Sequence, residues 1–247
     1  MPIALFRRPL PDPDHLLVRH GDRRFRVALK RRPTARRITL RVSAATGAVV
    51  LTLPERADLL AAQRFADAHA AWIAARLDKV PDRVPFAPGQ NLPLRGVPHR
   101  IVHWSTAAGV TRAVLAPDGE PVVAVACEPA HIARRVRDFL QREARRDLQE
   151  AVKRHAGALG LFPKRIAVRD TRSRWGSCSA GGALSFSWRL ILAPPFVLDY
   201  LAAHEVAHLK ELNHSPRFWR VTRELCPGMD EAEGWLKRHG AELHRFG

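Results

Sequence analysis

Two histidines one helical turn apart, with a glutamate beside the first, constrain this chain more than any other feature. The segment reads H-E-V-A-H and contains His204, Glu205 and His208. Residues four apart lie on the same face of a helix, so both imidazoles can bind one metal ion. The flanking residues 197–212 are mostly apolar, which predicts a buried helix. Buried histidines and a buried glutamate need partners, and a metal ion supplies one.

A third histidine, His214, follows His208 by six residues. Three protein ligands and one open position for water are what a catalytic zinc ion requires. Glu205 is then the expected catalytic residue, acting as general base for that water. About 0.06 occurrences of His-acid-x-x-His are expected by chance in a chain of this composition. This low number disfavours the alternative, a surface helix with two hydrogen-bonded histidines.

The chain must turn before His214 if this residue is to reach the metal. Proteases with the pattern H-E-x-x-H-x-x-G-x-x-H have a glycine three residues after the second histidine. Glu211 stands at that position here. Asn213 can adopt the left-handed conformation and end a helix, which would allow a tight turn just before His214. The alternative ligands are the Glu211 carboxylate and three other histidines, His155, His239 and His244.

The composition indicates one large domain or two small ones. The chain has 247 residues, of which 46% are hydrophobic, enough for a well-formed core. It lacks a run of about 18 apolar residues, and its proline-rich first residues do not resemble a signal peptide. The three cysteines are scattered and form no disulfide framework. We therefore expect a cytoplasmic protein without a transmembrane segment.

The net charge of +17 and the pI near 11.3 need an explanation. The positive electrostatic potential of such a protein attracts nucleic acids, nucleotides, acidic proteins or anionic lipids. The alternative is a generally arginine-rich surface. A basic cluster at residues 31–37 is either a solvated loop or a phosphate-binding segment.

We expect an α+β fold in three parts: an irregular arm at residues 1–20, a β-rich region at 21–128 and a metal-binding region at 129–247. In the β-rich region, short runs of β-forming residues separated by turns predict strands. They lie at residues 25–29, 38–42, 49–53, 92–94, 100–104, 110–115 and 122–127. The second and third of these should form a hairpin. A single long helix is expected at residues 55–80.

The last region is expected to be mainly helical. Apolar residues recur every four positions from Ile132 to Val152, which predicts a long amphipathic helix ending near Gly157. Its basic face is either solvated or lines a groove for an anionic substrate. Strands are expected at residues 164–169 and 184–188, the metal-binding helix from Pro194, and further helices at 217–225 and 230–244. Ser215 is the expected N-cap of the first of these two.

Four motifs then occur in order: R-S-R-W-G-S-C-S (172–179), W-R-L-I-L-A-P-P (188–195), D-Y-L-A-A-H-E-V-A-H (199–208) and N-H-S-P-R-F-W (213–219). They resemble the YgjP-like metallopeptidases, within a wider HExxH group that includes the SprT-like proteins. Residues 35–42 and 89–96 are similar more loosely. The resemblance implies a zincin-like catalytic domain with a small sheet, one zinc ion per chain bound by His204, His208 and His214, and Glu205 as the catalytic residue.

The expected substrate-binding residues are Trp175, Ser177, Arg172, Arg189 and Tyr200. The segment around Trp175 and Ser177 can offer an edge strand to an extended peptide. Tyr200 lies one turn before His204. It and the arginines, with Arg174, are the candidate donors to a tetrahedral oxyanion.

The expected activity is zinc-dependent hydrolysis of a peptide or protein. One alternative is hydrolysis of nucleotide phosphoanhydrides, which the basic charge favours and the lack of a glycine-rich phosphate loop disfavours. The other is a non-catalytic binding module whose metal is structural.

Overall fold

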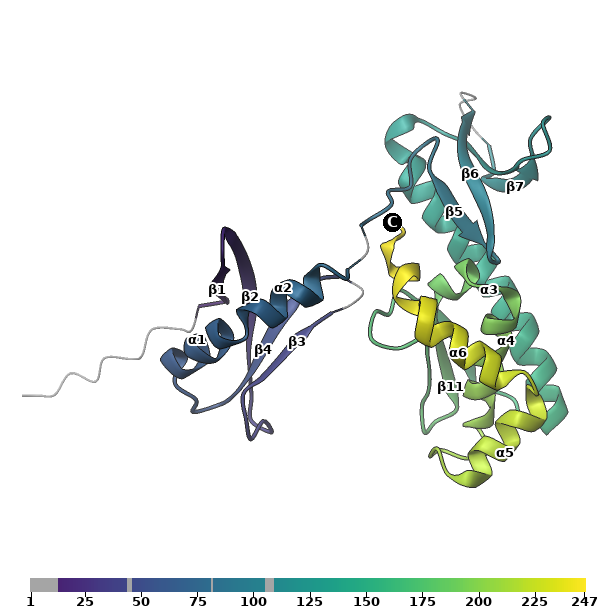
Figure 1. Ribbon diagram of the computed structural model, residues 1–247. Coiled ribbons are helices and arrows are strands. Elements are labelled where there is room, and N and C mark those ends of the chain that lie inside the picture. Colours follow the sequence, from purple (N-terminus) through teal and green to yellow (C-terminus); the bar gives the residue numbers. More distant parts are fainter. Residues whose placement is uncertain (1–12, 44–45, 81, 105–108) are drawn as a thin grey trace, which may run out of the picture. The chain divides into compact units, whose positions relative to one another are not determined.

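The structure is a computed structural model that describes residues 13–43, 46–80, 82–104 and 109–247. It has the expected mixed α+β class, with three small sheets and one long helix, α3. The chain divides into two compact units, Met1–Pro81 and Asp82–Gly247 (Figure 1). This division lies earlier in the chain than the expected boundary after residue 128.

The first unit contains a four-stranded sheet in the order β1-β2-β4-β3. Its strands are β1 (His15–His20), β2 (Arg23–Arg32), β3 (Thr39–Val42) and β4 (Val49–Pro54). β1 occupies the end of the segment expected to be an irregular arm, whose residues 1–12 lie outside the described part. β2 and β4 are parallel, whereas β1–β2 and β3–β4 are antiparallel. The β3–β4 pairing confirms the expected hairpin.

Two helices, α1 (Leu59–Ala68) and α2 (Ala70–Leu77), take the place of the single helix expected at residues 55–80. α1 begins late because the Asp58 carboxylate caps it, accepting the N–H of Ala61 at 3.1 Å. The two helices separate at His69, whose ring Nδ1 lies 2.8 Å from the carbonyl oxygen of Phe65. Both pack on the same face of the sheet (Figure 1).

The second unit begins with another four-stranded sheet, in the order β5-β6-β8-β7. Its strands are β5 (Asn91–Leu94), β6 (Val97–Trp104), β7 (Arg112–Leu115) and β8 (Pro121–Ala126). After the short 3-10 helix η1 (Pro129–His131), the chain enters α3 (Ile132–Leu159). Ile101 and Val123 of the sheet share a core cluster with Val136 of α3. This shared core explains why the sheet belongs to the second unit.

The turn of the β5–β6 hairpin is attached to the segment that leads into the metal-binding helix. The N–H groups of Arg95 and Gly96 donate to the carbonyls of Ile191 and Leu192 at 2.7 and 3.2 Å. Both turn residues have positive φ, 53° and 79°, as a two-residue hairpin turn requires. The Arg95 side chain also forms ion pairs with Glu143 and Asp147 of α3.

A three-stranded sheet in the order β10-β11-β9 and the last helices complete this unit. The strands are β9 (Arg165–Arg169), β10 (Gly176–Cys178) and β11 (Ala183–Ser187). The helical segments are the 3-10 helix η2 (Trp188–Leu192), α4 (Pro195–Ala207), α5 (Pro216–Leu225), α6 (Met229–His239) and the 3-10 helix η3 (Gly240–Arg245). α6 and η3 replace the single helix expected at residues 230–244.

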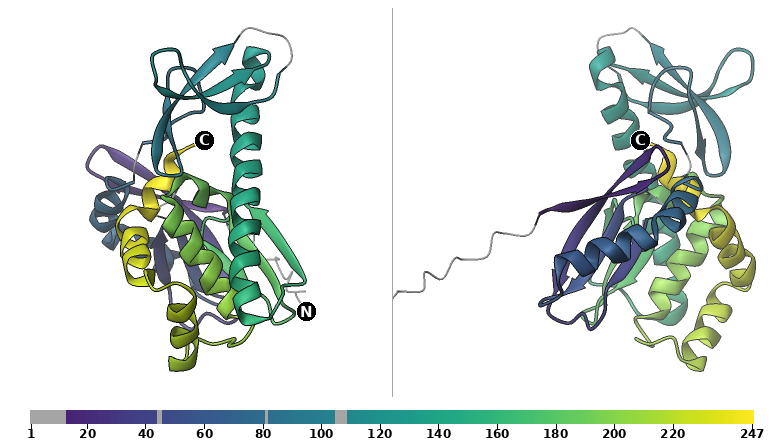
Figure 2. Two further views of the ribbon diagram at one scale, coloured as in Figure 1. Left: turned by 90° about the vertical axis from the view of Figure 1, so that its right-hand side faces the viewer. Right: turned by 60° about the vertical axis from the view of Figure 1, so that its left-hand side comes forward.

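The long helix α3 runs from the β5–β8 sheet to the region of α4 (Figure 2). It continues two residues past Gly157 and ends where Gly160 adopts the left-handed conformation, with φ of 65°. Its buried side chains join those of α4 and η2 in one core cluster, in which Trp188 is fully buried. Within the described ranges, every helix is too short or too polar to cross a membrane.

Candidate active site

The helix α4 places His204 and Glu205 at the edge of this core. Pro195 occupies its first turn, where a missing N–H costs nothing. Side chains on all sides of α4 are buried, including Ala202 and Ala203, which are 0% exposed. Such burial fixes the rotation of the helix about its axis, so the directions of His204 and Glu205 are determined by packing.

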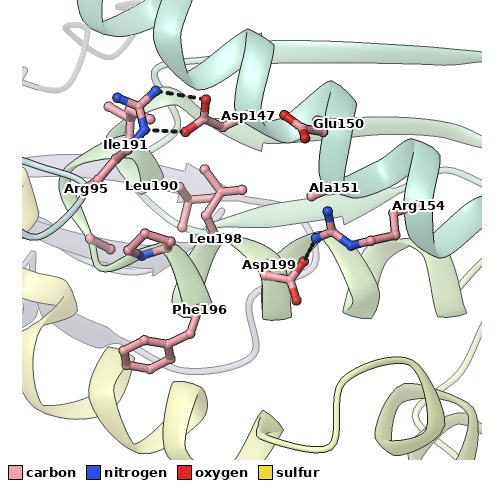
Figure 3. A pocket seen from close by; sticks show the side chains of 12 residues that line it. Arg95, Asp147, Glu150, Ala151, Arg154, Leu190, Ile191, Phe196, Leu198 and Asp199 are labelled. Carbon is pink, nitrogen blue, oxygen red and sulfur yellow. Dashed lines mark hydrogen bonds and ion pairs between the residues drawn. The ribbon is translucent and has the colours of Figure 1, made fainter.

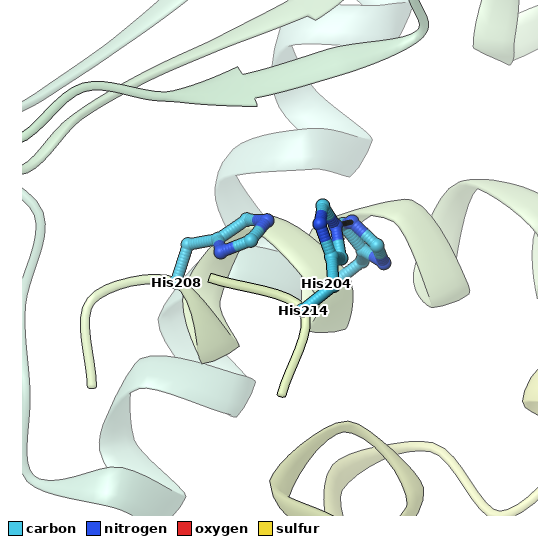
Figure 4. Close-up of side chains that lie close together, drawn as sticks. All are labelled: His204, His208 and His214. Carbon is cyan, nitrogen blue, oxygen red and sulfur yellow. Dashed lines mark hydrogen bonds between the residues drawn. The ribbon is translucent and has the colours of Figure 1, made fainter. Parts of the chain in front are cut away.

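Three histidines converge at the end of α4: His204, His208 and His214 (Figure 4). One ring nitrogen from each lies within 4.8 Å of the others, and Nε2 of His204 is 3.2 Å from Nε2 of His214. This is the one group of three or more His, Cys, Asp or Glu side chains with metal-binding geometry in the described residues. The convergence expected from the spacing is therefore present.

The chain reaches His214 by a different turn from the one expected. Among the described residues, Arg95 is the one non-glycine residue with positive φ, so Asn213 is not in the left-handed conformation. Instead, the N–H groups of Lys210 and Glu211 both donate to the carbonyl of Ala207 at 3.0 Å, which continues the helical turn past His208. Ser215 then caps α5, its Oγ accepting the N–H of Phe218 at 3.4 Å.

Two of the histidines, His204 and His208, are held neutral by their surroundings. Burial, together with the nearby His208 and His214, lowers the pKa of His204 to about 4. Burial also lowers the pKa of His208. The backbone carbonyl of Glu211 lies 3.0 Å from Nδ1 of His208, which places the proton on Nδ1 and leaves Nε2 free to bind a metal. Neutral imidazoles are the form that binds metal ions.

Two aromatic residues of α5 support the three rings. Phe218 is fully buried and stacks on His208, with ring centroids 4.4 Å apart. It also meets His204 and His214 at 4.9 and 4.8 Å. Trp219 contacts His214 at 5.5 Å. The sequence analysis assigned no role to either residue, although both lie in the motif that contains His214.

The Glu205 carboxylate is buried next to this cluster. Burial raises its pKa to about 7, and the positive charge of Arg174 acts in the opposite direction. Its Oε2 has no hydrogen-bond partner within the described part of the chain. β10 passes directly over it: a Cβ added to Gly176 would lie 2.3 Å from Oε1 of Glu205. A carboxylate with a pKa near neutral is suited to proton transfer.

An open cavity of about 350 Å³ lies over His204 and Glu205. Two of the predicted substrate-binding residues, Trp175 and Tyr200, line it. Trp175 also stacks on His244, with centroids 4.8 Å apart. Burial raises the pKa of Tyr200 to about 12, so its hydroxyl keeps its proton. The sequence analysis missed two further lining residues, Glu233 and Lys237, which form an ion pair on α6.

Ser177 lies on a second hollow of about 440 Å³, on a face of the β9–β11 sheet. Arg174 lines the same hollow, with Arg165 and Arg169 of β9. Neighbouring Cys178 is a poor nucleophile, because burial and then the charge of Glu205 raise its pKa.

The expectation that Arg189 contacts substrate is wrong. Arg189 is 3% exposed, and its guanidinium donates to Asp170 and to the carbonyls of Leu243 and Phe246. These bonds tie the C-terminal residues to η2, so this arginine has a structural role. Arg172 is exposed and lines neither hollow.

The remaining candidate ligands lie elsewhere. The Glu211 carboxylate faces Arg217 at 3.7 Å, His155 binds Asp199 at 2.8 Å, and His239 lies 3.7 Å from Glu242. A separate pocket of about 370 Å³ between α3 and α4 contains Asp199 (Figure 3). Its lining includes the ion pairs of Arg95 with Asp147 and of Arg154 with Asp199. The three histidines and Glu205 do not line it.

The three histidines fit a metal ion. Two nitrogens bound tetrahedrally at 2.0–2.1 Å from one zinc ion are about 3.3 Å apart, close to the observed 3.2 Å between the two Nε2 atoms. Unprotonated nitrogens repel each other at that distance unless a proton or cation lies between them. A fourth His, Cys, Asp or Glu ligand is absent from the group in the described residues, which leaves a position open.

Fold and site together define a mixed α+β protein with an HExxH helix and a three-histidine cluster that could hold a metal ion. Residues 36–239 match the family model "YgjP-like, metallopeptidase domain", and the chain belongs to this family.

The structure is also similar to the crystal structure of the metallopeptidase zymogen of Pyrococcus abyssi abylysin. The sequences are 22% identical, the match covers 40% of this chain and 97% of that chain, and the TM-score is 0.35. No functionally curated protein matches the chain.

Proposed function

We propose that this protein is a zinc-dependent peptidase in which His204, His208 and His214 hold the metal and Glu205 is the general base. The observation that carries the proposal is the position of Glu205: it borders the three-histidine cluster and lines the same cavity as His204. The family match to a metallopeptidase domain supports a peptide substrate. An open fourth position favours a catalytic metal over a structural one.

When bound, zinc lowers the pKa of a water ligand to about 7 and polarises a substrate carbonyl. Glu205 accepts a proton from the attacking water at its carboxylate and delivers it to the leaving amine. Its pKa of about 7 suits both transfers, because the carboxylate can take up and release a proton near neutral pH.

The substrate binds as an extended strand along β10. β10 is at one end of the sheet order β10-β11-β9, so one of its edges is free to pair with a peptide backbone. Gly176 of β10 lies against Glu205, which brings a paired peptide close to the general base. Trp175 and Tyr200 contact the substrate from the cavity walls, and the protonated Tyr200 hydroxyl donates to the oxyanion.

The test compares wild-type protein with Glu205→Gln on a peptide library and on nucleoside triphosphates, after zinc loading. We expect peptide cleavage that falls about 10²- to 10⁴-fold in Glu205→Gln while the zinc content stays the same. Glu224→Gln is the matched control, because Glu224 is exposed on α5 and lines neither hollow beside the site. Unchanged cleavage by Glu205→Gln would refute the general base. Turnover of nucleotides and not of peptides would refute the peptidase.

A further inference from the structure

The positive charge of this protein is concentrated in its first unit. Residues 1–81 contain 16 Lys and Arg against 7 Asp and Glu, a net charge of +9. Residues 82–247 contain 25 against 17, a net charge of +8 in about twice the length. The first unit therefore has about twice the charge density of the second, and the metal site does not account for it.

The strand β2 directs much of this charge to one side of its sheet. Alternate residues of a strand face opposite sides. Phe25 and Val27 are buried beneath the helices, whereas Arg24, Arg26 and Lys30 are exposed on the other side. Together with neighbours on β1, β2 and β3 they form a basic face, which consists of Arg19, Arg24, Arg26, Lys30, Arg32 and Arg41.

The described residues of this unit leave the charge of the basic face without partners of opposite sign. In the register of β1 and β2, Arg19 stands directly opposite Arg24. Like charges in that position destabilise a sheet. Among the described residues, no carboxylate forms an ion pair with any of the six cations. The ion pair between Arg23 and Asp78 involves a residue outside the basic face.

The helices of the unit do not cover the basic face. Ala62 and Ala66 of α1 and Ile73 of α2 pack with Phe25 and Leu51 on the opposite side of the sheet. Figure 1 shows both helices on that one side. The sheet has therefore one face for its core and one that is cationic.

A tryptophan lies beside the edge strand β3, on the side of the sheet that carries the helices. Trp72 of α2 is 39% exposed and lines a hollow of about 320 Å³ with Arg41, Arg76 and Lys79. The guanidinium of Arg76 lies 5.4 Å from the Trp72 ring centroid. Arg41 of β3 belongs both to this hollow and to the basic face, so the two meet at this edge of the sheet.

We propose that the basic face and the Trp72 hollow bind single-stranded nucleic acid. Arginine pairs with phosphate through its planar fork of donors, and five of the six cations are arginines. An exposed aromatic ring beside cations is the arrangement on which an unpaired base stacks. A duplex has no free base to offer to Trp72. An anionic membrane would also engage the cations and take up an interfacial tryptophan, so the experiment includes vesicles.

The experiment uses the full chain and a fluorescein-labelled oligothymidine of about 20 nucleotides, with anisotropy as the readout. The affinity is measured between about 50 and 200 mM salt, because each phosphate contact adds about 0.7 to the slope of log K against log salt. We expect Arg24→Ala/Arg26→Ala/Lys30→Ala to weaken binding at least about tenfold and to reduce the slope by about 2. Trp72→Ala should weaken binding about tenfold with an unchanged slope.

The matched control is Arg135→Ala/Arg145→Ala/Lys153→Ala, which removes three exposed cations from α3 in the second unit. The control should keep the wild-type affinity and slope. Circular dichroism checks that each variant folds. If the triple variant does not fold, the single variants Arg24→Gln and Lys30→Gln replace it. Each of these should reduce the slope by about 0.7.

Three results with oligonucleotides would overturn the proposal. The first is an absence of oligothymidine binding, and the second is an equal loss of affinity in the two triple variants. The third is an unchanged affinity in Trp72→Ala, together with a duplex that binds as tightly as the single strand. Binding of phosphatidylserine vesicles in place of the oligonucleotide would point to a membrane and would also refute it. Because the face is distant in sequence from the histidines, Glu205→Gln should bind the oligonucleotide like the wild type.

Discussion

Gly176 leaves the space that the Glu205 carboxylate occupies. A Cβ at this position would lie 2.3 Å from Oε1 and 2.7 Å from Cγ of Glu205, closer than non-bonded atoms approach. Glu205 is buried and α4 is packed on all sides, so the carboxylate cannot move aside freely. Glycine at position 176 thus allows the edge strand β10 to approach the general base directly.

Gly176→Ala should therefore lower peptidase activity about 100-fold, because a displacement of about 1 Å in a catalytic group costs that much. Cleavage rates and circular dichroism check this together. Gly181→Ala is the control, since its added Cβ would meet an atom no nearer than 3.8 Å and its φ is not positive. Full activity in Gly176→Ala would contradict the close contact.

Arg174 should set the lower pH limit of activity. Burial raises the pKa of Glu205 to about 7 even though the charge of Arg174, which stabilises the carboxylate, partly offsets this rise. In Arg174→Ala that pKa rises further, so the general base is protonated over a wider range. The acid limb of kcat/KM should then move to higher pH, with the activity at high pH kept. Arg174→Lys should return the acid limb to its wild-type pH. An acid limb that moves to lower pH in Arg174→Ala would contradict this role.

Phe218 should matter for metal affinity as well as for stability. It stacks on His208 and contacts the other two rings, so Phe218→Leu should loosen all three ligands. We expect a loss of about 1 kcal/mol in the free energy of unfolding and an approximately 10-fold weaker metal affinity. Chemical denaturation and competition with a chelator measure the two quantities.

The control for this prediction is Phe139→Leu, which alters a buried phenylalanine of α3 that contacts none of the three histidines. It should lose comparable stability and keep its metal affinity. An equal drop in metal affinity in both variants would mean that Phe218 acts through general stability alone.

The parts of the site predicted from sequence are those fixed by local geometry. His204 and His208 share a helix face, so their spacing was enough to predict that they converge. His214 was also predicted by spacing, but the turn that brings it there was not. The helical turn continues through Lys210 and Glu211, and Asn213 keeps a negative φ. Capping by Ser215 was predicted because it depends on neighbouring residues.

The parts that were not predicted depend on contacts between distant segments. Arg189 pairs with carbonyls more than 50 residues away, and no local pattern distinguishes it from a substrate-binding arginine. The β5–β8 sheet was assigned to the N-terminal region, yet its core is shared with α3. The role of Gly176 could not be predicted from the sequence, because a glycine in a turn-rich segment can serve many purposes. The packing of β10 against α4 is what identifies it.

The most direct test of the account is the metal content of untagged protein by elemental mass spectrometry, in wild type and in His208→Ala. We predict about one zinc ion per chain in the wild type and in His20→Ala, a control histidine at the end of β1, and a loss of the metal in His208→Ala. Wild-type protein that holds no metal after zinc addition and dialysis would contradict the account, because the three histidines would then not form a metal site.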